Sequence, residues 1–127
     1  MSAAFLLPGA GLARSLTAAL MLVLFGSAAD AQDRRGTRFW NLTANTVDQF
    51  YLSPAGKDTW GPNQCKNDKD GEVDHNERLR ITGVLSGRYD AKLHDERGRV
   101  CIVRGIEIKD GAIFSIEEKD LKDCTTR

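Results

Sequence analysis

The feature that most constrains this chain is a series of short segments in which polar and apolar residues alternate. Such alternation places every second side chain on one face of a strand, whereas an amphipathic helix repeats its apolar residues every three to four positions. Glycine-, proline- and asparagine-containing turns separate the segments about every ten residues. The sequence therefore predicts an all-β fold, a small antiparallel β-sandwich or barrel of six to seven strands. The expected strands are residues 37–43, 47–53, 78–84, 87–94, 99–103, 105–109 and 112–116.

The short gaps between strands predict which of them are neighbours. Residues 37–43 and 47–53 are joined by three turn-forming residues and indicate a hairpin. Residues 87–94 and 99–103 indicate a second hairpin. The charged stretch from Glu117 to Asp123 fits either one helical turn or an edge strand.

The N-terminus has the three parts of a secretion signal. Arg14 is the only charged residue before Asp30, residues 15–25 contain no charge, glycine or proline, and Ala29-Asp30-Ala31 ends the stretch with small residues. This pattern predicts a helical secretory signal peptide over residues 1–31. A membrane-spanning helix needs about 20 apolar residues, so the run is too short for an anchor. We therefore expect one mature β domain, residues 32–127, in the periplasm or outside the cell, with no membrane span.

The charge balance excludes two classes of partner. The chain has 18 basic and 18 acidic residues, and residues 1–31 remove one of each, Arg14 and Asp30. A net charge near zero gives no electrostatic reason to expect nucleic acid or an anionic membrane surface as a partner. The sequence leaves the partner unknown.

All three cysteines, Cys65, Cys101 and Cys124, lie in the expected mature chain. An oxidising compartment favours disulfide formation, and three cysteines cannot all pair within one chain. We expect one internal bridge and one remaining thiol, which is either buried or links two chains into a disulfide-linked dimer. The sequence does not decide which two cysteines pair.

An acidic loop, residues 65–77, carries the clearest chemical pattern. When Gly71 is placed at the sixth position of a twelve-residue loop that starts at Lys66, the spacing resembles an EF-hand calcium loop. Ca²⁺ takes six to eight oxygen ligands, and glycine permits the sharp bend that brings them together. The resemblance predicts a Ca²⁺ site. Its ligands are Asp68 (third), Asp70 (fifth), Glu72 through its carbonyl (seventh), Asp74 (ninth) and Glu77 (twelfth), with apolar Val73 at the eighth position.

The loop departs from the EF-hand pattern in two ways. Lys66 occupies the first ligand position, where an aspartate is expected, and it adds a positive charge beside the ion. The flanking residues 56–62 and 81–84 do not form the two helices of an EF-hand. The alternative interpretation is a metal-free binding module in which the acidic segment is only a solvated turn.

No pattern of residues indicates an enzyme. His75 and His94 are the only histidines, and neither Ser86 nor Ser115 has the flanking glycines of a nucleophile elbow. The aromatic residues Trp40, Phe50, Tyr51 and Trp60 gather near one end of the mature chain and are expected in the core. An exposed Trp60 would instead permit contact with a peptide or a sugar.

The order of several short motifs resembles a family of small exported proteobacterial proteins of unknown activity, common in rhizobia. The motifs are Phe39-x-Asn41-x-Thr43, Phe50-Tyr51-Leu52-Ser53-Pro54-Ala55-Gly56, Trp60-Gly61 and Gly87-x-Tyr89-Asp90-x-x-Leu93. The resemblance implies a compact exported β domain and no particular activity. Many members have a cysteine at the position of Arg88 and another near Lys109, so it also implies that the usual bridge of that family is absent here. The acidic loop is characteristic of a subset.

Overall fold

The computed structural model describes residues 36–126, and the predicted signal peptide lies outside this range. Within it the chain is all-β, with seven strands and two short 3₁₀ turns, which confirms the predicted fold class. No helix in this part of the chain is long and apolar enough to cross a membrane. The strands are β1 (Arg38–Leu42), β2 (Val47–Pro54), β3 (Arg78–Arg80), β4 (Gly87–Asp95), β5 (Arg99–Ile108), β6 (Ile113–Glu117) and β7 (Asp123–Thr126); the 3₁₀ turns are η1 (Gln64–Asn67) and η2 (Glu118–Asp120).

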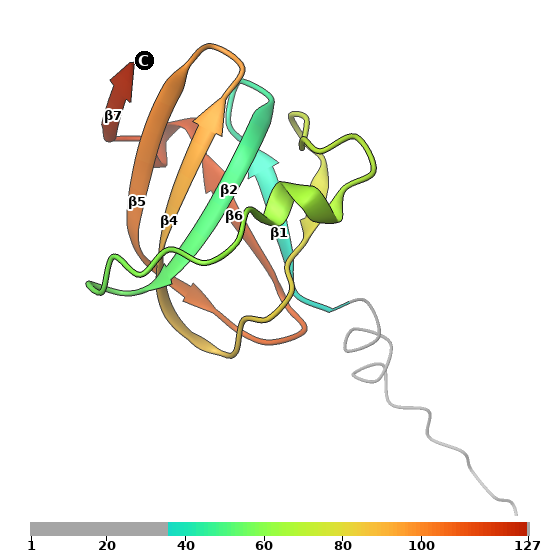
Figure 1. Cartoon of the computed structure of the whole chain (residues 1–127), viewed down its shortest axis with the longest axis vertical. Coiled ribbons are helices and arrows are strands. Elements are labelled where there is room, and N and C mark those ends of the chain that lie inside the picture. Colours follow the sequence, from blue (N-terminus) through green and yellow to red (C-terminus); the bar gives the residue numbers. More distant parts are fainter. Residues whose placement is uncertain (1–35, 127) are drawn as a thin grey trace, which may run out of the picture.

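The strands form two sheets that face each other as in a β-sandwich. One sheet has three strands in the order β3-β1-β6, and the other has four in the order β2-β4-β5-β7. Figure 1 shows the four-stranded sheet in front of β1 and β6. The core lies between the sheets: the Phe39 and Phe50 rings stack at 4.2 Å, and Phe114 lies 5.7 Å from Phe39. Because these rings come from β1, β2 and β6, they join the two layers.

The predicted hairpin of residues 37–43 and 47–53 is wrong, because β1 and β2 belong to different sheets. Three polar residues at the end of β1 and in the turn after it are buried: Asn41, Thr43 and Asn45. The side-chain NH₂ of Asn41 donates to the backbone carbonyls of Asn45 and Val73. Its side-chain oxygen accepts from the backbone amide and the hydroxyl of Thr43. These bonds satisfy buried polar groups while the chain crosses from one sheet to the other.

One pair of strands is parallel, which the antiparallel prediction did not include. β1 pairs with β6 in parallel over five positions, from Arg38–Ile113 to Leu42–Glu117. A parallel pair needs a long connection, and here almost the whole domain serves as that connection. The remaining strand pairs are antiparallel, including the predicted β4–β5 hairpin.

Three predicted segments differ in extent from the observed strands. Residues 99–103 and 105–109 form the single strand β5, and the register of β4 against β5 shifts between Tyr89 and Ala91. Gly105 has a φ of 70°, which favours glycine at this irregular position. The predicted strand 78–84 is limited to β3, three residues long.

The disulfide joins Cys101 on β5 to Cys124 on β7, and these residues face each other directly in the two strands. Cys65 is the free cysteine and is fully buried. The expected single bridge with one remaining thiol is therefore confirmed. Because Cys65 is not at the surface, it does not provide the link for a disulfide-linked dimer.

Candidate functional site

The acidic loop is anchored to both sheets. Val47 on β2 and Val73 form an isolated antiparallel bridge with two hydrogen bonds, of 2.9 and 2.8 Å. The backbone amide of Asn41 on β1 donates to the backbone carbonyl of Glu77, and the backbone amide of Asn76 donates to the backbone carbonyl of Asn41. These bonds hold the backbone of the loop against both sheets, while most of its side chains are exposed.

The carboxylates of the loop bond to neighbouring groups. Asp68 accepts from the backbone amide of Asp70 at 2.7 Å, and Glu77 accepts from the backbone amide of Asp74 at 2.8 Å. Asp74 accepts from the Thr46 hydroxyl at 2.9 Å. Each of these contacts fixes a turn of the loop or ties it to the start of β2.

The predicted calcium ligands are not brought together. Asp70 and Glu72 are exposed, and within residues 36–126 no group of three or more His, Cys, Asp or Glu side chains is placed to hold a metal ion. Two features do match a calcium loop: Gly71 has a φ of 73° at the sixth position, and the eighth residue, Val73, is buried. The Ca²⁺ site stays a prediction.

A second candidate site lies on the outer face of the four-stranded sheet. Tyr51 on β2, Lys92 on β4 and Ile102 on β5 are direct partners across the strands and share one face, while Ala91 and Leu93 point into the core. All three of these outer residues are half-buried.

Two aromatic rings share one ammonium group on this face. The Lys92 nitrogen lies 5.3 Å from the centre of the Tyr51 ring and 4.8 Å from that of Trp60, which comes from the loop after β2. The edge of Tyr51 also meets the His94 ring at 5.9 Å. Such cation–π contacts hold the rings and the lysine in a fixed arrangement. We call Tyr51, Trp60, Lys92 and His94 the aromatic face.

A small polar pocket of about 190 Å³ adjoins the aromatic face. The register of β2 against β4 shifts between Val47 and Gln49, which leaves Asp48 as the extra residue of a bulge. Bulges redirect side chains, and Asp48 lines the pocket with a buried Oδ1 that has no hydrogen-bond partner. The lining residues are Asp48, Gln49, His94, Asp95, Glu96, Gly98 and Arg99.

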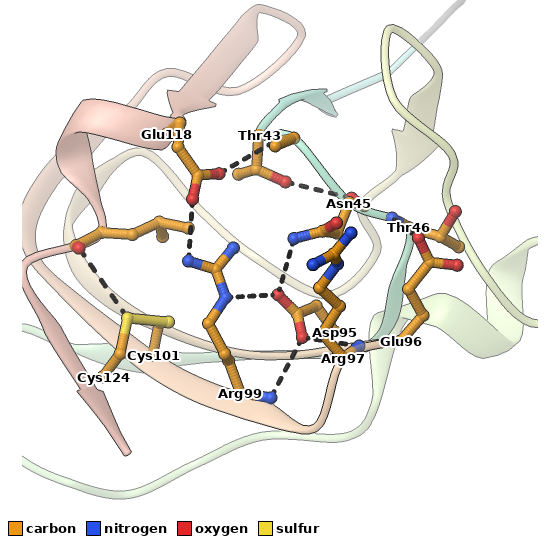
Figure 2. A network of polar contacts seen from close by, with 12 residues as sticks. Thr43, Asn45, Thr46, Asp95, Glu96, Arg97, Arg99, Cys101, Glu118 and Cys124 are labelled. Atoms are coloured by element: carbon orange, nitrogen blue, oxygen red, sulfur yellow. Dashed lines mark hydrogen bonds and ion pairs between the residues drawn. A yellow bond between two sulfur atoms is a disulfide. The ribbon is translucent and has the colours of Figure 1, made fainter. Parts of the chain in front are cut away.

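Asp95 and Arg99, which line this pocket, belong to an ion-pair network (Figure 2). Asp95 is buried and accepts from the Arg99 side chain at 2.8 Å, and Arg99 reaches Glu118 at 2.7 Å. Burial raises the pKa of Asp95, but the bonds from the Arg99 side chain and from the Arg99 and Arg97 amides outweigh it and leave this pKa below its usual value. The Arg99 bond and the Ala44 amide lower the pKa of Glu118.

Sequence reasoning identified part of the aromatic face and missed the pocket. It singled out Trp60 and Tyr51 but not Lys92, because cross-strand partners depend on register. The sequence did hold a signal for the bulge at Asp48: the apolar residues Val47 and Phe50 lie three positions apart, which strict alternation does not allow, and the structure buries both.

The described residues thus define a small all-β domain of β-sandwich type with one internal disulfide and a half-buried aromatic face on one sheet. A scan of protein-family models, a search of curated proteins and a search of solved structures each found no match to the chain. The resemblance to the small exported proteobacterial family therefore stays a prediction from the motifs.

Proposed function

We propose that this protein is a small exported binding module that recognises its ligand on the aromatic face. The observation that carries the proposal is the position of the Lys92 ammonium over the partly exposed rings of Tyr51 and Trp60. Aromatic side chains give a large contact area for little loss of side-chain entropy, and they are typical of binding surfaces. The proposal assigns no catalytic role.

Two observations support export to the periplasm or beyond. Residues 1–31 have the composition of a secretory signal, and the Cys101–Cys124 bridge is of a kind that persists in oxidising compartments. The expected mature chain begins at Gln32. Mass spectrometry of the protein in separated periplasmic and cytoplasmic fractions tests this directly, and a chain found only in the cytoplasm with residues 1–31 retained would count against export.

A fragment screen by ¹⁵N NMR tests the binding face. A set of small aromatic, sugar, amine and carboxylate probes is added to the mature chain at millimolar concentration. We expect the shift changes to gather around Tyr51, Trp60 and Lys92. A matched control is built into the molecule: Trp40 on the other sheet also has a cation above it, Arg78 at 4.5 Å, but its ring nitrogen donates to Asn76. Changes confined to Trp40, or absent everywhere, would reject the proposal.

Calcium binding by the acidic loop is a second candidate function, favoured by the positive φ of Gly71 at the required bend. To complete a site, Asp74 and Glu77 would have to exchange their present hydrogen bonds for the ion. Because this exchange costs free energy, we propose a weak site, with a dissociation constant of about 1 mM, as in extracellular modules.

A calcium titration of the mature chain tests this second candidate. At 10 mM Ca²⁺ such a site would add about 1.4 kcal/mol to the free energy of unfolding. The Asp70→Asn variant should lose this gain, and Asp123→Asn, which removes an acid from β7, should keep it. If thermal melting and tryptophan fluorescence are the same in CaCl₂ and in NaCl of equal ionic strength, the loop has no calcium role.

A further inference from the structure

The pocket and the aromatic face form one continuous surface. Gln49 and His94 line the pocket, and both contact Tyr51: the Tyr51 hydroxyl donates to Gln49 at 2.7 Å, and the His94 ring meets the edge of Tyr51. A ligand that lies on Tyr51 and Trp60 therefore has a polar pocket directly at its end.

The pocket calls for a hydrogen-bond donor. Asp48 presents a buried carboxylate oxygen without a partner, and a buried acceptor of this kind is costly unless water or a ligand donates to it. The volume of about 190 Å³ corresponds to about six water molecules of about 30 Å³ each. It therefore accommodates the hydroxyl-bearing edge of one small ring and excludes a large side chain.

The two ends of the surface carry opposite charges. Asp48, Asp95 and Glu96 line the pocket, and Arg99, the one guanidinium in its lining, already bonds to Asp95 and Glu118, so an anion is repelled there. At the other end the Lys92 ammonium already lies over both rings, so a second cation is repelled. A ligand that spans both ends is therefore best matched by uncharged hydrogen-bond donors.

We propose, on the basis of the binding-module function above, that this surface takes a neutral saccharide. The apolar C–H face of a sugar ring would lie on Trp60 and Tyr51, and hydroxyl groups would enter the pocket and donate to Asp48. Sugars combine an apolar face with uncharged donors, which is the combination that a mostly apolar contact with a few polar groups selects.

Affinity electrophoresis tests the proposal with defined polymers in the gel. The neutral probes are laminarin, dextran and galactomannan, and the charged probes are alginate and chitosan. We expect at least one neutral polymer to retard the mature protein. Trp60→Ala and Asp48→Asn should each weaken that binding about tenfold, the effect of losing about 1.4 kcal/mol. Trp40→Ala is the matched control on the other sheet and should change the binding by less than about twofold.

The outcomes separate this inference from the proposed function. If alginate or chitosan binds through Trp60 and the neutral polymers do not, the saccharide is not neutral and the inference fails while the binding face stands. If no polymer binds but the NMR probes gather at Tyr51 and Lys92, the inference also fails alone. Circular dichroism checks the fold of each variant. Trp60→Phe, which keeps a ring, replaces Trp60→Ala if the latter unfolds, and it should bind with intermediate strength.

Discussion

At the scale of single residues, Asn41 sets the path of the chain although it contributes no apolar surface to the core. It is fully buried, and its side-chain amide group makes four hydrogen bonds, to Thr43 and Asn45 in the turn and to Val73 in the acidic loop. A buried amide of this kind is favourable only when all its partners are present, so it selects one conformation of the turn between β1 and β2.

Replacement of this amide should be costly. In Asn41→Leu the Val73 carbonyl and the Thr43 amide lose their partner inside the protein, and each unsatisfied buried group costs about 1–3 kcal/mol. We expect a loss of about 3 kcal/mol in the free energy of unfolding, measured by urea denaturation. A loss below about 1 kcal/mol would mean that the turn does not depend on Asn41.

The buried carboxylate Asp95 should also be sensitive to substitution. Its side chain is 1% exposed, and Asp95→Asn weakens its contact with Arg99 while leaving most of that guanidinium covered. Breaking a partly buried ion pair should cost about 2 kcal/mol, less than a fully buried one because Arg99 is 25% exposed. The exposed Lys119–Glu117 pair provides the control, and Lys119→Gln should leave the denaturation midpoint unchanged.

Asp90 and Asp95 predict the response to acid. Burial raises the pKa of Asp90, but the Gly56 and Gly105 amides and Arg104 outweigh it, so the pKa of Asp90 lies below its usual value, as does that of Asp95. Because both folded-state pKa values are depressed, their stabilisation is complete above the unfolded pKa of about 3.9 and is lost as the pH falls through the folded values. Urea midpoints should therefore decline below about pH 4. Asp95→Asn should show a smaller decline than the wild type.

At the scale of elements, β7 depends on the disulfide. All four of its residues are exposed, and it forms the edge of its sheet with β5 as its neighbour. The two cysteines are 23 residues apart in sequence. In the chain-entropy model a bridge that closes such a loop lowers the entropy of the unfolded chain and adds about 3 kcal/mol to the free energy of unfolding.

Removing the bridge should therefore loosen β7 first. In Cys101→Ala/Cys124→Ala we expect a loss of about 3 kcal/mol in the free energy of unfolding. Amide exchange should accelerate in β7 while β2 and β4 keep their protection. If β4 loses protection to the same extent, the bridge stabilises the whole sheet and not only its edge.

Most strands could be predicted from alternation, while only one of their pairings, β4 with β5, could be predicted. Residues 87–94 and 99–103 were recognised as a hairpin because a short turn joins two alternating segments. The same logic failed for β1 and β2, since the buried hydrogen bonds of Asn41 override the short connection. The pairing of β1 with β6 has no local signal, because strand partners far apart in sequence are decided by packing.

The candidate sites follow the same division. The spacing of acids in the loop 65–77 was readable, but the direction of each side chain depends on neighbours such as Thr46, which lies outside the loop. The aromatic face depends on the register that places Tyr51 opposite Lys92, and the pocket depends on a bulge. A sequence shows which residue types are present. Which of their side chains come together in one site can be predicted only when the register of the strands is known.

At the scale of the whole molecule, chemical labelling of the Cys65 thiol measures unfolding. It is fully buried, and burial together with the nearby Asp48, Asp68 and Glu72 raises its pKa to about 12. With Cys101 and Cys124 bridged, it is the one remaining thiol of the three cysteines in the chain. A thiol reagent at pH 8 should label native protein only at the rate of unfolding, and instantly in 6 M guanidinium chloride. Rapid labelling of the native protein would contradict the burial of Cys65.

The parallel pairing of β1 with β6 has a consequence for the time at which this chain can fold. The partner of the first strand is complete only at Glu117, after β2, β3, β4 and β5 have been added to the chain. During synthesis Phe39 therefore has no Phe114 to pack against until those four strands have been made. The pairing that closes the three-stranded sheet is accordingly a late step of folding, and the hairpin of β4 and β5, whose partners are close in sequence, can form before it.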